Sequence, residues 1–401
     1  MQMNNVPFDW KMNKLGHVAD VFDGTHQTPE YVDHGIKFIS AEDISDPSAS
    51  TKYITHQAFE NNFKIRPNKN DIFMTRIGRI GIPFLLKTDE DFAYYVTLAL
   101  LKLKRDVVPE YLFYFIQGNY FQFELWKRTL HVAFPEKINK DEIGKCLVLY
   151  PDNITEQKKI AEIFGTWDRA IEELTDLIAE KKELKRGLMQ RLLTGIQRLP
   201  GFTKPWKKIK LSDVLEECTE TTTINNQYDI LTSSRRGIFK QEDYFDKQVA
   251  SQDNIGYKII HNGDFTYRAM TDDDKFCFNQ LTDLEIGIVS PAYAVFQTKK
   301  IPGNILKFIL NSGRFGYELL KEAQGGTRKS LKYNSLIKLQ IYVPDDEKEM
   351  DKLSDCLFVA DSEIDLLNQQ LNVLREQKRG LMQKLLTGEI RVKVDKKITL
   401  G

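Results

Sequence analysis

The feature that most constrains this 401-residue chain is an internal repeat. KRGLMQRLLTG at 185–195 recurs as KRGLMQKLLTG at 378–388, with ten of the eleven positions identical and an offset of 193 residues. The same offset pairs Pro151 with Pro344 and Asp168 with Asp361. A period of this length is too long for a solenoid. It predicts two copies of one unit, each a globular segment followed by a helix.

Around each copy of the motif, apolar residues recur at steps of three and four positions. Ten of eleven stepped positions between 350 and 385 are apolar, as are eight of eleven between 157 and 192. A 3.5-residue period held over this length predicts a coiled-coil seam. Each helix follows a proline and ends at a glycine (Gly195, Gly388), as helix start and stop preferences favour.

The two helices are predicted to be partners of each other within one chain. The second globular segment leaves the end of the first helix and returns to the start of the second, so the pair should be antiparallel. The predicted seam residues are Phe164, Trp167, Ile171, Leu174, Ile178, Leu188, Leu357, Ile364, Leu367, Leu371, Leu374 and Leu381. Pairing of two chains through either seam is the alternative.

The predicted fold class is α+β, with two similar α/β domains separated by two long antiparallel coiled-coil helices and an internal pseudo-two-fold repeat. The predicted segments are a first domain at 1–152, a helix at 153–196, a second domain at 197–345, a helix at 346–390 and a tail at 391–401. Stretches rich in β-branched and aromatic residues predict the strands. These strands are 35–39, 72–75, 94–103 and 146–150, with counterparts at 228–232, 265–267, 292–297 and 339–343; helices are predicted at 109–126 and 303–323.

Composition excludes several classes of protein. Hydrophobic residues make up 41% of the chain, which is enough to build cores and excludes wholesale disorder. The 57 basic and 57 acidic residues cancel, which argues against a polyanion binder that relies on bulk positive charge. The apolar stretches are far shorter than the roughly 20 residues that span a bilayer, and no signal-peptide pattern opens the sequence. We therefore expect a cytoplasmic protein with no membrane partner.

The usual catalytic motifs are missing from the sequence. It contains no P-loop, GxGxxG, HExxH or GxSxG motif, and no Pro-Pro pair of the kind found in amino-methyltransferases. Its four cysteines lie far apart and its six histidines are scattered. The sequence PDDEK at 344–348 is similar to a nuclease motif, but its acids suit the start of the following helix. We expect no catalytic residue, no metal site and no cofactor in this chain.

Together these features resemble the specificity subunit of a type I restriction-modification enzyme. The resemblance rests on the duplicated KRGLMQ[RK]LLTG helices, on DIFMTR at 71–76 and DFTYR at 264–268, and on GGTRKSL at 325–331. In the first domain, VAFPEK at 132–137 stands where the Gly-Thr-Arg segment should fall. The resemblance implies a non-catalytic subunit that reads a bipartite sequence in double-stranded DNA, with one half per recognition domain. It also implies two adenine-N6 methyltransferase subunits and further restriction subunits, which would carry the S-adenosylmethionine, ATP and Mg.

A neutral chain that reads DNA must concentrate its positive charge locally. Between 64 and 87 there are six cations and one acid, and between 321 and 340 there are five cations and one acid. Arginine pairs bidentately with guanine, whereas lysine and serine mainly hold phosphates. Candidates in the first domain are Thr25, His26, Gln27, Lys64, Arg66, Arg76 and Arg79. Candidates in the second are Ser233, Ser234, Arg235, Arg236, Tyr267, Arg268, Arg328, Lys329 and Lys332.

Other interpretations of these residues and of the whole chain stay open. Arg76 and Arg268 each follow an apolar strand and could instead satisfy a carboxylate such as Asp71 or Asp264, and residues 25–28 could be an ordinary turn. The chain could be a stand-alone sequence-specific DNA-binding protein that dimerises through its long helices, or a structural coiled-coil adaptor. Capture of methyltransferase subunits would distinguish the first function from these two.

Overall fold

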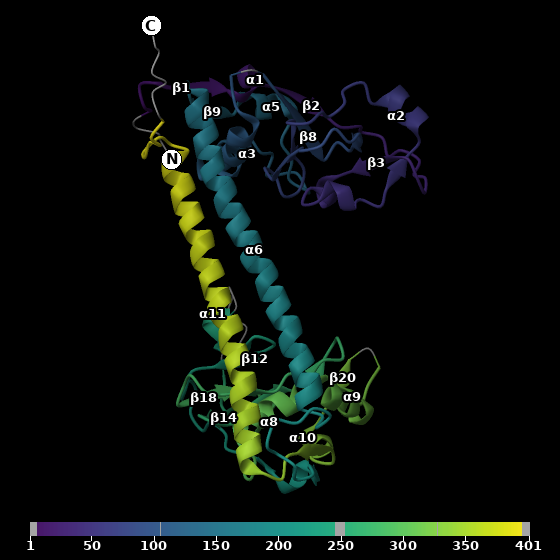
Figure 1. Cartoon of the computed structure of the whole chain (residues 1–401), viewed down its shortest axis with the longest axis vertical. Helices are drawn as coiled ribbons and strands as arrows, with labels where there is room; N and C mark the ends of the chain where they lie inside the picture. Colours follow the sequence, from purple (N-terminus) through teal and green to yellow (C-terminus); the bar gives the residue numbers. More distant parts are fainter. Residues whose placement is uncertain (1–5, 105, 245–252, 327, 395–401) are drawn as a thin grey trace. The chain divides into compact units, whose positions relative to one another are not determined.

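The computed structural model describes residues 6–104, 106–244, 253–326 and 328–394. The chain divides into two compact units: unit 1 is Met1–Thr175 with Gln370–Gly401, and unit 2 is Asp176–Gln369. The long helices α6 (Ile154–Leu192) and α11 (Glu347–Leu385) each begin in one unit and end in the other. Each unit therefore contains one globular domain, the first part of one long helix and the last part of the other (Figure 1).

Both long helices lie inside their predicted ranges, and local chemistry explains where they begin and end. Oδ1 of Asn153 accepts from the amide of Thr155 at 2.9 Å before α6, and Oδ1 of Asp346 accepts from the amide of Lys348 at 3.0 Å at the start of α11. These contacts satisfy amides that have no partner inside the helix. Asp346 thus acts as a helix cap, which is the structural role predicted for the PDDEK sequence.

Within each unit the two helices run antiparallel. Ion pairs join each helix to the other helix or to the segment that follows it, and residue numbers along one partner rise as those along the other fall. These pairs are Glu156–Arg391 and Asp168–Lys378 in unit 1, and Lys185–Asp361 and Arg198–Glu349 in unit 2. Each pair of unit 1 is related to a pair of unit 2 by the 193-residue offset, with the helices exchanged. The sequence repeat is therefore also a repeat of helix–helix contacts.

The predicted seam residues are all shielded from solvent. Five are buried: Phe164, Ile178, Leu357, Ile364 and Leu371. The other seven are half-buried: Trp167, Ile171, Leu174, Leu188, Leu367, Leu374 and Leu381. By contrast, Leu184, Phe358, Val359 and Leu366, which lie off the seam, are each at least 58% exposed.

Unit 1 is built on a four-stranded antiparallel sheet of order β2-β8-β5-β6, a three-stranded sheet of order β4-β3-β7 and a β1-β9 pair. Its strands are β1 Trp10–Lys14, β2 Ala19–Asp23, β3 Ile36–Ile39, β4 Tyr53–Ile54, β5 Ile72–Thr75, β6 Pro83–Leu85, β7 Phe92–Tyr94, β8 Leu98–Leu103 and β9 Leu147–Pro151. Its short helices are α1 Leu15–Val18, α2 His56–Asn62, α3 Pro109–Gln117, α4 Asn119–Trp126 and α5 Lys140–Lys145. One core joins this domain to the helices, because Phe164 of α6 and Met382 and Leu385 of α11 pack with the domain's buried side chains.

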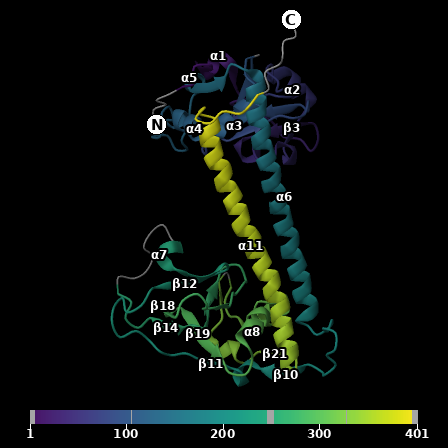
Figure 2. The same cartoon turned by 60° about the vertical axis from the view of Figure 1, so that its left-hand side comes forward.

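Unit 2 repeats the main sheet as β11-β19-β15-β17 and the strand pair as β10-β21, and adds the pairs β12-β13, β14-β18 and β16-β20. Figure 2 labels β10, β11, β12, β14, β18, β19 and β21 of this unit. Its strands are β10 Lys207–Lys210, β11 Leu215–Glu217, β12 Leu231–Ser234, β13 Gly237–Lys240, β14 Lys258–His261, β15 Phe265–Arg268, β16 Met270–Thr271, β17 Asn279–Gln280, β18 Ile286–Val289, β19 Tyr293–Thr298, β20 Lys329–Ser330 and β21 Gln340–Val343. Its short helices are α7 Gln241–Tyr244, α8 Gly303–Leu310, α9 Gly313–Glu322 and α10 Tyr333–Leu336. Leu192 of α6 and Leu353 and Leu357 of α11 belong to its core.

The helix predicted at 109–126 is two helices, α3 and α4, that meet at Gly118. Gly118 is extended (φ −71°, ψ 145°). A side chain there would lie 3.1 Å from the carbonyl oxygen of Phe115 and 3.2 Å from Leu386. The helix predicted at 303–323 divides in the same way, because the Ser312 side chain caps α9 by accepting from the amide of Phe315. Apolar periodicity alone did not predict these breaks.

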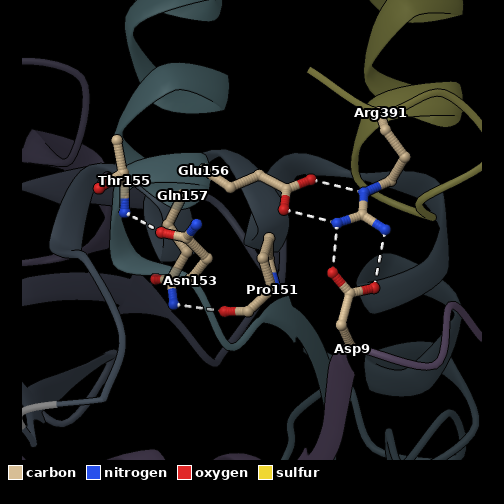
Figure 3. A network of polar contacts seen from close by, with 7 residues as sticks. All are labelled: Asp9, Pro151, Asn153, Thr155, Glu156, Gln157 and Arg391. Atoms are coloured by element: carbon tan, nitrogen blue, oxygen red, sulfur yellow. Dashed lines mark hydrogen bonds and ion pairs between the residues drawn. The ribbon is translucent and has the colours of Figure 1, made fainter. Parts of the chain in front are cut away.

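An arginine clasp, made of Asp9, Glu156 and Arg391, closes unit 1 where α6 begins (Figure 3). Nε and Nη2 of Arg391 donate to the two carboxylate oxygens of Glu156 at 2.6 and 2.7 Å, and Nη1 and Nη2 donate to Asp9 at 2.8 and 2.7 Å. The Arg391 guanidinium also lies 5.6 Å from the ring centroid of Trp10. The Glu156 side chain is only 1% exposed, so it depends on Arg391 for charge compensation.

We expect Arg391→Ala to lower the free energy of unfolding by about 2–3 kcal/mol, because it leaves the Glu156 carboxylate buried and unpaired. This is less than for a fully buried pair, since the Arg391 side chain is 38% exposed. Urea denaturation of the full chain measures the change. Lys11→Ala is the control, since the Lys11–Asp152 pair is 48% and 62% exposed and should contribute less than about 0.5 kcal/mol. Equal losses of stability in the two variants would contradict the predicted contribution of the arginine clasp.

Candidate nucleic-acid interface

Three loops of unit 1 meet at one edge of the main sheet. They follow β2 (residues 24–28), β5 (76–81) and α4 (127–139). The amide of Val96 donates to Thr25 at 2.9 Å and the amide of Arg76 donates to Thr97 at 2.9 Å, which joins the first two loops through the turn at 95–97. The amide of Gly78 donates to the carbonyl of Glu136 at 2.8 Å and joins the second loop to the third. We call these three segments the first loop cluster.

The first loop cluster contains five of the predicted DNA contacts, namely Thr25, His26, Gln27, Arg76 and Arg79. His26, Gln27 and Arg79 are exposed there, and Thr25 is half-buried. Thr25 shapes its turn by accepting from the Gln27 amide at 3.3 Å. The loop begins at a glycine because a side chain at that position would come within 2.4 Å of the Tyr94 carbonyl oxygen.

Arg76 is a structural residue, so its prediction as a DNA contact is wrong. It is 6% exposed, and its Nη1 lies 2.6 Å from Oδ1 of Asp23. Its Nε donates to the carbonyl of Ile138 at 3.0 Å. The alternative that Arg76 satisfies a carboxylate is therefore correct, although the acid is Asp23 and not Asp71, which pairs with Lys102. The guanidinium thus connects the end of β2, through Asp23, to the third loop, through Ile138.

Lys64 and Arg66 do not join the first loop cluster. They follow α2, which packs on the β4-β3-β7 sheet through Phe59 and Phe63. Arg66 is held by Glu60 at 2.5 Å and its guanidinium lies 4.8 Å from the ring centroid of Phe59. Lys64 is exposed.

A second loop cluster forms in unit 2 from the β12–β13 hairpin, the segment 268–276 and the segment 324–332. Asn279 anchors the hairpin by donating to Oγ of Ser233 at 2.8 Å and to the carbonyl of Ser234 at 2.7 Å. The β16-β20 pairing joins the other two segments. A cavity of about 370 Å³ lies in this cluster, with Ser233, Ser234, Arg235 and Arg268 in its lining.

Two arginines of the second loop cluster, Arg235 and Arg328, form ion pairs with acids that sequence reasoning missed. Arg235 pairs with Asp273, and Nε of Arg328 lies 2.5 Å from Oδ1 of Asp272. Arg328 also lowers the pKa of Asp272 by hydrogen bonding to its carboxylate. The run of three aspartates at 272–274, four residues after Arg268, was the sequence signal for these partners.

In unit 2, the prediction of Tyr267 as a DNA contact is wrong. Tyr267 is fully buried, it donates from its hydroxyl to the carbonyl of Leu331 at 3.2 Å, and burial raises its pKa. Arg268 and Lys332 are exposed and Lys329 is half-buried. Arg236 lies over the rings of Phe239 and Tyr244, at 5.7 and 5.0 Å from their centroids. Thr327 of the Gly-Gly-Thr-Arg segment lies outside the described residues.

Two further searches concern the described ranges only. Among these residues no group of three or more His, Cys, Asp or Glu side chains could hold a metal ion. None of the helices in the same part of the chain is long and apolar enough to cross a membrane.

The fold and its two loop clusters define a class: a protein with two similar domains, each with exposed polar and basic loops, connected by a pair of long helices. Residues 7–185 match the family described as the type I restriction modification DNA specificity domain. The comparisons with known proteins thus confirm the resemblance to specificity subunits of type I restriction-modification enzymes.

Relatives and solved structures extend this similarity over the whole chain. The chain is 24% identical to the type I restriction enzyme MjaVIII specificity subunit of Methanocaldococcus jannaschii, over 97% of this chain and 94% of the relative. It is also similar in fold to the S subunit of a type I system from M. genitalium, with a TM-score of 0.58 at 13% identity over 95% and 96% of the two chains. A chain from a study of type I complex assembly gives a TM-score of 0.60 at 14% identity, over 96% and 100% of the two chains.

Proposed function

We propose that this chain is the DNA-recognition subunit of a type I restriction-modification complex, and that each domain reads one half of a bipartite target. The observation that carries the proposal is the pair of loop clusters, one per unit, on a chain that matches the DNA specificity domain over residues 7–185. Each cluster exposes arginine with serine, threonine, histidine or glutamine. These side chains can pair with base edges and phosphates.

The chain itself is proposed to be non-catalytic and to act through partners. Two adenine-N6 methyltransferase subunits would bring S-adenosylmethionine, and restriction subunits would bring ATP and Mg. Zero formal net charge supports this dependence, because a chain with only local basic patches gains limited affinity from phosphate neutralisation on its own. The cytoplasm, where the host DNA lies, is the proposed location.

The stand-alone alternative requires the helices to dimerise, and the contacts within the chain disfavour it. In unit 1 Phe164 of α6 packs in the same core as Met382 of α11, and in unit 2 Leu192 of α6 packs in the same core as Leu357 of α11. The apolar seam is therefore already covered inside one chain. A second chain would have to displace these contacts before it could pair.

The test joins a physical assay to a genomic one. Affinity-tagged full-length chain, co-expressed with the methyltransferase subunit of the same system, should be captured as a complex with two methyltransferase copies, as measured by native mass. Single-molecule sequencing should show methylated adenine in one bipartite motif, lost on deletion of this gene and restored by its return. Tight sequence-specific binding by a dimer of this chain alone would support the stand-alone alternative. Capture of the methyltransferase subunits without any DNA footprint would support the structural coiled-coil adaptor instead.

A further inference from the structure

The first loop cluster ends in an exposed apolar tip, defined here as Val132 and Phe134. Their side chains are 98% and 105% exposed. Among the large apolar side chains of the described residues, only these two and Phe8 exceed nine-tenths exposure. Single exposed apolar residues are common, but two fully exposed ones at alternate positions of one loop need a reason.

The tip stands on a structured base. The amide of Leu130 donates to the carbonyl of Lys137 at 2.8 Å, so the loop closes like a small hairpin. Inside it, the His131 ring nitrogens lie 3.1 Å from Glu136 Oε1 and 2.9 Å from the Trp126 carbonyl, and Glu136 raises the pKa of His131. The Gly78 amide also holds Glu136 from the neighbouring loop. A projection built in this way loses little conformational entropy when it binds.

The internal repeat shows that the tip occupies the place of a predicted DNA contact. In unit 1, Ile77 forms a bridge with Lys137; in unit 2, Met270 pairs with Ser330, and both residues are 193 positions later. The segment 131–136 therefore corresponds in fold to the segment that carries Arg328. Where the second domain presents an arginine, the first presents a valine and a phenylalanine.

The surroundings of the tip favour DNA over a protein partner. Arg79 and Lys137 are exposed beside it, on the same loops. The nearest acid, Glu136, is occupied by His131. The apolar parts of DNA are the base faces and the thymine methyl group, which aromatic and aliphatic side chains contact in wedges and stacks.

This inference rests on the proposed function. We propose that Phe134 and Val132 contact bases directly in the half-site read by the first domain, and that the phenyl ring stacks on a base that has left the helical stack. The first domain then reads its half-site by an apolar contact flanked by Arg79. The second domain reads its half-site with arginines.

The experiment uses the full chain assembled with its methyltransferase subunits. The probe is a duplex that carries the methylated motif found by sequencing, with 2-aminopurine placed at each adenine of the first half-site in turn. The wild-type complex should raise 2-aminopurine fluorescence at one position other than the adenine that is methylated, because an unstacked base is less quenched and the methyltransferase subunit itself takes its target adenine out of the stack. Phe134→Ala should abolish this rise and weaken binding about tenfold or more. The salt dependence of binding should stay unchanged, since no phosphate contact is lost.

Phe8→Ala is the matched control, because Phe8 has the same side chain and 106% exposure in the same unit, outside the loop cluster. It should bind like the wild type, and Phe134→Trp should restore binding and fluorescence. Two results would overturn this inference and leave the proposed function standing. One is unchanged DNA binding by Phe134→Ala; the other is a Phe134→Ala variant that loses its methyltransferase subunits while its DNA binding stays intact. A wild-type complex that binds no specific DNA would overturn the proposed function as well.

Discussion

Leu357→Asp is expected to unfold unit 2 or to cost it at least about 4 kcal/mol of stability. Leu357 is 0% exposed in the core that joins α11, the last turns of α6 and the second domain. Truncating such a leucine to alanine alone costs roughly 3–5 kcal/mol, and a buried charge without a partner adds to this. A whole domain is stable by only about 5–15 kcal/mol, so most of the margin is lost.

Val359→Asp is the matched control for this change. Val359 lies two residues further along the same helix and is 64% exposed, so its replacement should alter stability by less than about 0.5 kcal/mol. Urea denaturation followed by circular dichroism, with the mass in solution measured by light scattering, checks both variants. If Leu357→Asp merely converted a dimer into a folded monomer, the pairing of the helices within one chain would be wrong.

Exchange of residues 15–146 for the equivalent segment of another specificity subunit is expected to replace one half of the methylated motif completely and to leave the other half unchanged. The segment lies between β1 and β9, so the exchange keeps both paired strands and the arginine clasp. The physical reason is that each loop cluster is built from one unit's own contacts. Its side chains can therefore be replaced without changing the other cluster.

The reciprocal exchange, of residues 211–339 between β10 and β21, is the control. It should change the opposite half of the motif. Single-molecule sequencing of methylated adenine in cells that carry each chimera measures both outcomes. A chimera that changed both halves, or that kept the original motif, would contradict independent reading by two domains.

The sequence predicted the repeat, the long helices and their antiparallel pairing because these depend on local or periodic patterns. The ends of α6 and α11 differ from the predicted ranges by only a few residues, since a proline, a capping side chain and a glycine act within one turn. Strands such as β5 and β15 followed from β-branched and aromatic runs for the same reason, whereas β2, β6, β11 and β17 of the main sheets were not predicted and the strand predicted at 94–103 is divided between β7 and β8. The break at Gly118 was not predicted, because it depends on where α3, α4 and Leu386, the residue that follows α11, meet.

Which candidate side chains reach the surface was decided only by tertiary structure. Arg76 and Arg79 are three residues apart and alike in sequence, yet one is buried against Asp23 and the other is exposed. The partners of Arg76, Asp23 and Ile138, lie 53 and 62 residues away along the chain, so no local pattern contains them. The role of a charged side chain depends on its neighbours in space. These neighbours are determined only when the fold brings distant loops to one edge of a sheet.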